Sequence, residues 1–397
     1  MNRNMRHAAE APVYSRLPFF PVSGNRHLLR DEDGREFIDL YGGHAVALLG
    51  HNPETVVAAI QEESRKLLFY SNALPIAARD RFIGKLTQSA APGCRRVFLV
   101  NSGTEANEQA LALARRLTGR RRIVCLEGGF HGRSLAALAA SGIPRYRELA
   151  ECGGAGSEML ELTRICPFDD VDSLPRYVDD EVAAVILEPV QGLAGARALS
   201  QPFLEEVRRL CSRHGALLIF DEVQSGCGRC GAFTCAEAVG VVPDLLTLAK
   251  GLGSGLPIAA VLMNDEIADA LSPGDLGSTF GGGPIPCAAA YATVSLLDKE
   301  LFANVEQIER CIREGVASLP FVKQVHGRGA LLGIEITGRA ALLQEELFRR
   351  NYLTGTCLDP HTLRLLPPLN LPIAVARDFV DVLRSAASEQ PTWSLSE

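Results

Sequence analysis

The 397-residue sequence contains no apolar run of the length that a membrane-spanning helix needs, about 18–20 residues. Its N-terminus, MNRNMRHAAEAPVYSR, lacks the apolar centre of a secretory signal peptide. Lys and Arg number 40 against 47 Asp and Glu, and the formal net charge of −7 argues against a dedicated nucleic-acid binder. These absences favour a cytoplasmic protein that acts on neither a membrane nor a nucleic acid.

Paired cysteines and metal-ligand patterns are also lacking. The eleven cysteines are scattered along a large chain without a secretion signal, so we expect reduced thiols. Cys227 and Cys230 form a lone CxxC with Cys235 nearby. A structural zinc site would need a second pair, or histidines at matching spacing, and the sequence offers neither. We therefore expect no metal site.

Short apolar strands alternate with amphipathic helices through most of the chain. This alternation predicts an α/β fold, with a mostly parallel sheet covered by helices on both faces. Such sheets bind ligands at the carboxyl ends of their strands. The expected strands are 36–41, 96–100, 122–126, 181–187 and 217–220, and the expected helices include 52–68, 104–117 and 203–214.

The pattern changes after the glycine cluster at 281–283. We expect residues 51–289 to form a large domain, and residues 1–50 and 290–397 to form the two parts of a smaller α+β domain. No repeat, low-complexity tract or linker composition interrupts the chain. In the C-terminal part we expect a long helical stretch over 286–317 and strands at 321–325, 330–336 and 362–366.

A carboxylate and an isolated lysine are the most suggestive residues. Asp221 follows the apolar run GALLIF, where a strand should end, and Lys250 lies among small residues in TLAKGLGSG. This pair suits pyridoxal phosphate: the lysine would hold the cofactor as a Schiff base, and the carboxylate would keep its pyridine nitrogen protonated. On these residues alone, a surface lysine and a helix-capping aspartate fit equally well.

The segment NSGTEAN at 101–107 follows a buried strand and opens a helix. The first N–H groups of a helix have no internal partners and form an anion site. Gly103 permits close approach of the backbone, while Ser102 and Thr104 add hydroxyl donors. The segment suits a single phosphate better than a nucleotide, because it lacks both a P-loop lysine and a three-glycine pattern. A plain helix cap is the alternative.

Other polar residues fall at strand ends or inside apolar runs. In the loop GGFHGR, which also contains His131, Phe130 could stack on a planar ring and Arg133 could take a carboxylate. Glu188 follows another strand. Arg364 lies within an apolar run, where a partly buried guanidinium needs an anion such as a substrate carboxylate. A core phenylalanine and a solvated arginine are the simpler interpretations of the GGFHGR loop.

In their order along the chain, these motifs resemble the class III aminotransferases among the fold-type I pyridoxal phosphate enzymes. The resemblance is strongest to the acetylornithine and succinylornithine aminotransferase group, and it runs from roughly Gly34 to Pro368. It implies a large domain with a seven-stranded sheet. The motifs are LYGGHAV, LGHNP, NSGTEANE, GGFHGR, EPVQG, FDEVQSGCGRCGAF, PDLLTLAKGLGSGLPIAA, GSTFGGGP and RLLPPL.

The resemblance implies a role for each matching residue. Lys250 would hold the aldehyde carbon of the cofactor as a Schiff base and then move the substrate proton, and Asp221 would pair with the pyridinium nitrogen. Phe130 and Val223 would enclose the ring, and Gln224 would reach its phenolic oxygen. The cofactor-binding set is Ser102, Gly103, Thr104, Phe130, His131, Glu188, Asp221, Val223, Gln224, Lys250 and Thr279.

The resemblance also implies partners. In this family the residue matching Thr279 comes from the partner subunit, which implies a homodimer with shared active sites. Arg133 would take the substrate carboxylate far from the reacting amine, and Arg364 the α-carboxylate of glutamate or 2-oxoglutarate. The chain departs from the family at Leu193. Many ornithine-type members have a glutamate there that masks the arginine matching Arg364.

The leading hypothesis is amino-group transfer from the terminal amine of an N-acylornithine-like ω-amino acid to 2-oxoglutarate, as in arginine biosynthesis. The alternatives are another class III donor (4-aminobutyrate, ornithine, lysine or a diamine) and an amino acid racemase or epimerase of the same fold. A regulator without turnover is disfavoured, because Lys250 and Asp221 are both present. The sequence leaves the donor and its acyl group open.

Overall fold

The computed structural model describes residues 11, 13–14, 16–151 and 155–388. A seven-stranded sheet organises the middle of the chain, in the order β4-β12-β11-β10-β7-β5-β6. All neighbouring strands in it are parallel except β12, which runs antiparallel to β11 and β4. The expected mostly parallel α/β sheet is confirmed. Its strands are β4 (Arg96–Val100), β5 (Arg122–Leu126), β6 (Thr163–Cys166), β7 (Val182–Leu187), β10 (Leu217–Asp221), β11 (Leu245–Leu248) and β12 (Ala259–Met263).

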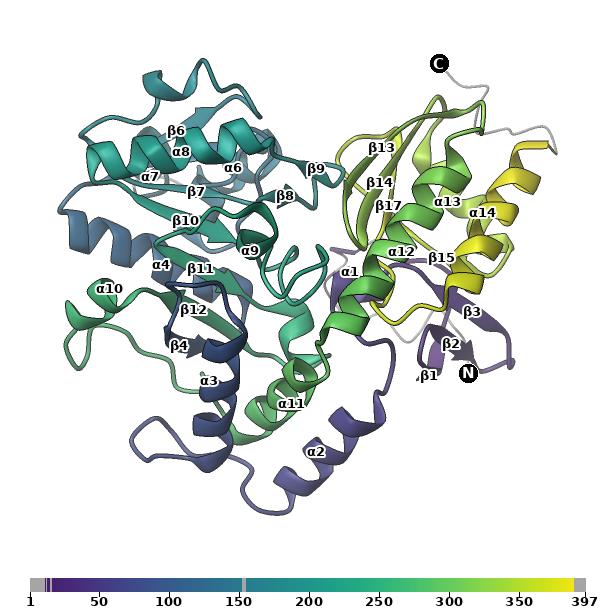
Figure 1. The fold of residues 1–397 in the computed structure, drawn as a ribbon, viewed down its shortest axis with the longest axis horizontal. Helices are drawn as coiled ribbons and strands as arrows, with labels where there is room; N and C mark the ends of the chain where they lie inside the picture. Colours follow the sequence, from purple (N-terminus) through teal and green to yellow (C-terminus); the bar gives the residue numbers. More distant parts are fainter. Residues whose placement is uncertain (1–10, 12, 15, 152–154, 389–397) are drawn as a thin grey trace.

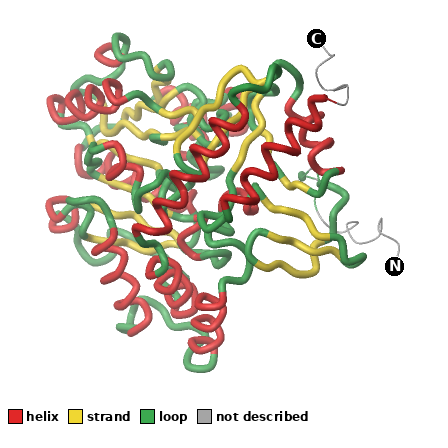
Figure 2. The backbone as a smooth tube through the Cα atoms, turned by 45° about the vertical axis from the view of Figure 1, so that its right-hand side comes forward, coloured by secondary structure: helices red, strands yellow, loops and turns green. Residues whose placement is uncertain are grey.

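Helices cover both faces of this sheet, and Figure 2 shows the strands flanked by them. Successive strand residues point to opposite faces, so Ile219 packs in one core and its neighbours Leu218 and Phe220 pack in the other. The first core includes α4 and α5, and the second includes α3, α8 and α11. These helices are α3 (Ala77–Ser89), α4 (Gly103–Thr118), α5 (Leu135–Ala139), α8 (Gln201–His214) and α11 (Pro284–Ser295).

Shorter elements connect and border the sheet. None of the helices in the described residues is long and apolar enough to cross a membrane. The remaining elements of this region are α2 (Glu54–Ser64), α6 (Pro144–Ala150), α7 (Ala155–Glu161), η2 (Leu174–Arg176), β8 (Val190–Gln191), β9 (Arg197–Ala198), α9 (Cys235–Val239), η3 (Lys250–Gly253) and α10 (Asp265–Asp269).

The two ends of the chain meet in a second body, where the purple N-terminal strands lie beside the yellow-green C-terminal elements (Figure 1). One sheet has the order β1-β2-β3-β15 and a second has the order β13-β14-β17-β16. Leu40 shares one hydrophobic core with α12, α13 and α14. The bounds are β1 (Pro21–Asn25), β2 (Leu28–Asp31), β3 (Glu36–Asp39), α1 (Gly42–Ala45), α12 (Lys299–Val316), β13 (Val322–Arg328), β14 (Leu331–Ile336), α13 (Ala340–Arg349), β15 (Tyr352–Leu353), β16 (Gly355–Thr356), β17 (Thr362–Leu365) and α14 (Ile373–Ser388).

The expected helical stretch over 286–317 is two helices, α11 and α12. Asp298 separates them, because its extended backbone ends the helical path and its side chain accepts a hydrogen bond from Leu301 N at 2.8 Å. Apolar periodicity continues across the break, so the sequence pattern did not reveal it. The domain boundaries near residues 50 and 290 stay predictions.

Candidate active site

A cavity of about 660 Å³ lies at the carboxyl ends of the parallel strands. The segments that follow β4, β5, β7, β10 and β11 contribute to its wall, as the ligand position of such sheets predicts. Among the residues that line it are Ser102, Gly103, Thr104, Phe130, His131, Arg133, Glu188, Asp221, Val223, Gln224, Lys250 and Arg364.

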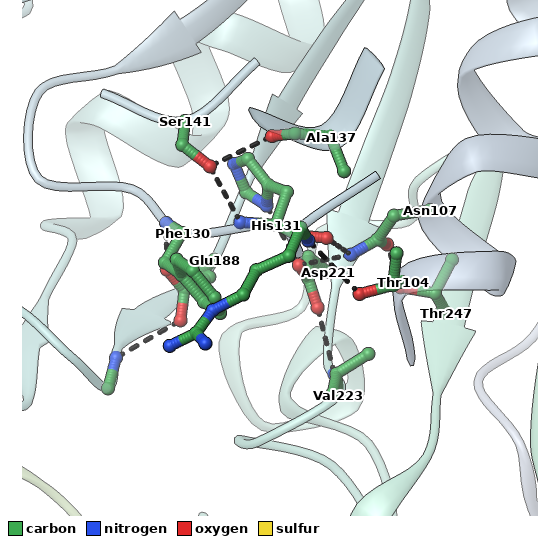
Figure 3. A network of polar contacts seen from close by, with 12 residues as sticks. Thr104, Asn107, Phe130, His131, Ala137, Ser141, Glu188, Asp221, Val223 and Thr247 are labelled. Carbon is green, nitrogen blue, oxygen red and sulfur yellow. Dashed lines mark hydrogen bonds and ion pairs between the residues drawn. The ribbon is translucent and has the colours of Figure 1, made fainter. Parts of the chain in front are cut away.

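The Asp221 carboxylate, at the end of β10, is held on both oxygens and is only 3% exposed. Its Oδ2 accepts hydrogen bonds from Asn107 Nδ2 at 2.7 Å and pairs with His131 Nδ1 at 2.8 Å, as Figure 3 shows. Its Oδ1 accepts from Val223 N at 3.0 Å. Two segments that are distant in the sequence, together with the turn directly after β10, therefore fix the direction in which this carboxylate points.

Three residues of this network were missed in the sequence. Asn107 also donates to the carbonyl of His131 at 2.8 Å, and its Oδ1 accepts from Thr247 Oγ1 at 2.7 Å. Ser141 Oγ accepts from His131 N at 3.3 Å. Asn107 could have been recognised in the sequence, because asparagine is unfavourable in a helix interior and is unusual on an apolar helix face. Thr247, inside the apolar strand LLTL, left a similar one.

Glu188 connects two loops and lies near Asp221. Its Oε1 accepts from Phe130 N at 2.9 Å and its Oε2 from Gly192 N at 3.1 Å. Burial raises the pKa of the Glu188 carboxyl, and the negative charge of Asp221 raises it further. Glu188 therefore orients the aromatic loop of Phe130 through backbone contacts, and it holds a proton more readily than an exposed glutamate does.

Lys250 begins η3 immediately after β11 and faces the same cavity. Burial lowers the pKa of its amine from 10.5 to about 8; the carboxylates of Asp221 and Glu188 oppose this shift, and the cation of Arg364 adds to it. The backbone of Lys250 has a φ of +45°, a left-handed conformation that lysine rarely adopts. Such strain is typical of functional sites.

The N-terminus of α4 forms another wall of the cavity. Ser102 caps the helix through its Oγ, which accepts from Glu105 N at 3.2 Å. The N–H groups of Gly103 and Thr104 have no partner within the helix and suit an anion. Gly103 allows Val223 to pack against this turn, because a Cβ at position 103 would lie 2.6 Å from the Val223 side chain.

Arg364 projects from β17 and is buried, with 3% of its surface exposed. Its Nη1 donates to the carbonyl of Gly192 at 3.0 Å, with Gln224 Oε1 at 3.5 Å, and its Nη2 donates to the Tyr41 hydroxyl at 2.9 Å. The sequence interpretation missed Tyr41, although this residue belongs to the motif LYGGHAV. Leu193 lines the same cavity.

Arg133 lies at an exposed edge of the cavity, with its guanidinium carbon 5.5 Å from the centre of the Tyr146 ring. Phe130 also packs on Tyr146, with the ring centres 5.0 Å apart. The cavity therefore has arginines on two of its walls, one buried and one exposed.

Thr279 is the predicted site residue that does not line this cavity. It is exposed, in the loop before α11, next to Phe280. Its neighbour Ser278 holds the loop by accepting from Gly281 N at 3.1 Å and from Asn101 Nδ2 at 3.2 Å. In the described residues, no group of three or more His, Cys, Asp or Glu side chains is arranged to hold a metal ion.

Comparison with known proteins shows the family of this chain. The family model described as "Aminotransferase class-III" matches residues 10–386. The chain belongs to the class III aminotransferases. This family depends on pyridoxal 5'-phosphate, and the protein is accordingly a pyridoxal phosphate-dependent transaminase.

Among its relatives, the acetylornithine aminotransferase of Methanopyrus kandleri is 41% identical over 82% of this chain and 82% of its own length. The crystal structure of N-acetylornithine aminotransferase from Stenotrophomonas maltophilia is similar with a TM-score of 0.80 and 32% identity, covering 94% of this chain and 96% of its own. An ornithine aminotransferase from Toxoplasma gondii, with partial occupancy of PLP at its active site, has a TM-score of 0.85 and 27% identity, covering 96% of this chain and 92% of its own.

The residues present fit pyridoxal phosphate. The cavity combines a fixed carboxylate for the ring nitrogen, a lysine whose pKa is lowered toward neutrality, and helix N–H groups for the phosphate. The close packing of Val223 on Gly103 brings an apolar side chain next to the turn that would hold the phosphate. Asp221, Lys250 and Gly103 would hold the cofactor in this way.

The lowered pKa of Lys250 can be tested on the protein after removal of the cofactor. Modification of Lys250 by an amine-reactive reagent, followed by peptide mass spectrometry, should rise with pH and reach half its maximum near pH 8, because the neutral amine reacts. The exposed Lys299 in the same digest serves as the internal reference for reagent strength. A midpoint for Lys250 above pH 10 would contradict the electrostatics described for this site.

Proposed function

We propose that the protein transfers an amino group from the terminal amine of an N-acylornithine-like ω-amino acid to 2-oxoglutarate, giving a semialdehyde and glutamate. The observation that carries this proposal is the cavity itself, which joins Asp221 and Lys250 to two arginines, Arg133 and Arg364. A substrate with two carboxylates needs two such cations. The names of the relatives, acetylornithine aminotransferases, support the choice of donor.

When bound, pyridoxal phosphate supplies a carbon that bonds amines and a ring that accepts electrons as the substrate C–H bond breaks. Asp221 would face the ring nitrogen and keep it protonated, since Asn107 and His131 fix one carboxylate oxygen. Phe130 and Val223 would enclose the ring. Gly103 and Thr104 would bind the phosphate at the start of α4.

Lys250 would move the proton. Its Nζ must be neutral to accept hydrogen from the substrate carbon, and the pKa of about 8 leaves a useful neutral fraction near neutral pH. Arg133 would hold the carboxylate distant from the reacting amine, and Arg364 the carboxylate adjacent to it, each by paired N–H donors. Gln224, His131 and Glu188 would complete the cofactor surroundings. A cytoplasmic location belongs to the same proposal.

A donor panel tests this function. With 2-oxoglutarate as acceptor, glutamate formation should be fastest with N-acetylornithine or N-succinylornithine, compared with ornithine, 4-aminobutyrate and lysine. Lys250→Ala should lower kcat by about 10³-fold or more, because the proton-transfer group is lost. If none of the donors yields glutamate while an α-amino acid racemises without an acceptor, the transfer reaction proposed here is wrong.

We further propose that the enzyme is a homodimer in which Thr279 serves the partner's cavity. The loop of Thr279 is exposed beside an apolar surface, and the ring centres of Phe69 and Phe280 are 5.1 Å apart there. Phe280 is 64% exposed and Leu68 is 70% exposed, although both side chains are large and apolar. A second copy of the chain would cover this surface.

Mixed dimers of two defective variants test the shared site. Lys250→Ala abolishes the proton-transfer group, and Thr279→Ala should weaken cofactor binding, seen as loss of activity at limiting pyridoxal phosphate. If Thr279 acts in the partner, a purified dimer of one subunit of each kind contains one intact site, with about half of the wild-type activity. If Thr279 acts in its own subunit, the mixed dimer shows no gain over the Thr279→Ala homodimer.

A further inference from the structure

Arg364 is buried without an acidic partner in the part of the chain that the structure describes. It is 3% exposed, and its hydrogen-bond acceptors are a backbone carbonyl, an amide oxygen and a phenol. Its Nε has no partner. A buried guanidinium normally needs a carboxylate. Leu193, which lines the same cavity, cannot supply one.

The phenol is that of Tyr41, and it makes two polar contacts. Its oxygen accepts from Arg364 Nη2 at 2.9 Å and lies 2.6 Å from His44 Nδ1. Because an arginine can only donate, the single hydroxyl hydrogen is free to point at His44, whose Nδ1 then accepts. Burial lowers the pKa of His44, and the cations of Arg364, Lys250 and Arg133 lower it further, which favours this neutral imidazole.

The turn that carries both residues is strained and firmly held. Residues 42–45 all have φ between +55° and +70°, although His44 and Ala45 are not glycines. Asp39 Oδ1 accepts from the backbone N–H groups of Tyr41 and Gly42, each at 2.8 Å. Strained backbone that the surroundings maintain in this way is typical of functional positions.

The backbone of β16 lies against the Tyr41 ring and leaves room for it. Gly355 in β16 pairs with Arg364 in β17, and a Cβ at position 355 would overlap the Tyr41 ring. Only glycine, which has no Cβ, leaves room for the Tyr41 ring at position 355. The Arg364 guanidinium carbon is 5.4 Å from the centre of the same ring.

We propose that Tyr41 is a specificity-determining residue of this enzyme. Its hydroxyl oxygen accepts from Arg364, where an acidic side chain would be expected, while its hydrogen points to His44. When a substrate carboxylate binds at Arg364, the hydroxyl donates this hydrogen to the carboxylate instead. The carboxylate is that of a 2-oxo acid or α-amino acid, next to the reacting carbon. This inference rests on the proposed function, in which Arg364 binds that group.

The change of acceptor from His44 to the substrate carboxylate is favourable, because a hydroxyl donates a stronger hydrogen bond to a carboxylate than to a neutral imidazole. No proton is transferred, since the hydroxyl only changes its acceptor. No acidic side chain has to leave Arg364 before the substrate carboxylate binds. Tyr41 therefore favours substrates with a carboxylate beside the reacting carbon, and it has no such effect on the ω-amine donor.

Glutarate binding to the holoenzyme tests this role without turnover, because glutarate has the two carboxylates of 2-oxoglutarate but no oxo group. We expect Tyr41→Phe to raise the calorimetric Kd for glutarate about tenfold, the loss of one hydrogen bond to a charged group. The KM for 2-oxoglutarate should rise by a similar factor. The KM for N-acetylornithine should stay within about twofold, since no carboxylate of that donor meets Tyr41.

Tyr177→Phe removes a hydroxyl outside the cavity and is the matched control, expected to leave glutarate binding unchanged. Gly355→Ala, whose added methyl would push the Tyr41 ring aside, should give the same selective loss as Tyr41→Phe. It provides a second route to the answer if Tyr41→Phe folds poorly. Unchanged glutarate binding in the folded variants, or an equal rise in the KM for N-acetylornithine, overturns the inference.

The failure of this inference differs from failure of the proposed function. If the wild-type enzyme forms no glutamate from any amine donor, the proposed function is wrong, and the role of Tyr41 at Arg364 falls with it. If the wild type is active and Tyr41→Phe binds glutarate as tightly as the wild type does, only the role of Tyr41 is wrong.

Discussion

The buried carboxylate of Asp221 is the constraint on which the rest of the site depends. Removing a carboxylate from water is costly unless hydrogen bonds replace the lost solvation. Here Asn107 comes from the helix after β4, His131 from the loop after β5, and Val223 N from the turn after β10 itself. Satisfying one charge therefore ties together three strand-end segments, and the same segments carry the groups that would bind the phosphate and enclose the ring.

The electrostatics of the cavity follow from that charge. Asp221 raises the pKa of Glu188 and opposes the lowering of the pKa of Lys250 by burial. Arg364 adds positive charge from the second body of the chain, held by neutral groups where an acid would be expected. Arg364 can therefore bind an anionic substrate group, which is the physical basis for proposing an acceptor with two carboxylates, 2-oxoglutarate.

The sequence predicted the sheet and most of the cavity lining, because strand ends are visible as apolar runs followed by polar residues. It did not reveal Tyr41 as a partner of Arg364, since those residues are 323 positions apart and meet only through tertiary packing. Asn107 and Thr247 are polar residues in an apolar helix face and an apolar strand, but that pattern does not reveal which groups they bond to. The break between α11 and α12 at Asp298 was not predicted for a different reason: the helical spacing of apolar residues continues through it.

The most direct test of the central claim is the ring-nitrogen protonation state of bound pyridoxal phosphate, read from the ¹⁵N chemical shift of cofactor labelled at that nitrogen. If Asp221 is fixed to face the ring, the nitrogen should be protonated at pH 7 in the wild type and should lose that proton in Asp221→Asn, whose side chain cannot stabilise the cation. An unprotonated nitrogen in the wild-type enzyme, or a shift unchanged by Asp221→Asn, would contradict the assignment of this carboxylate.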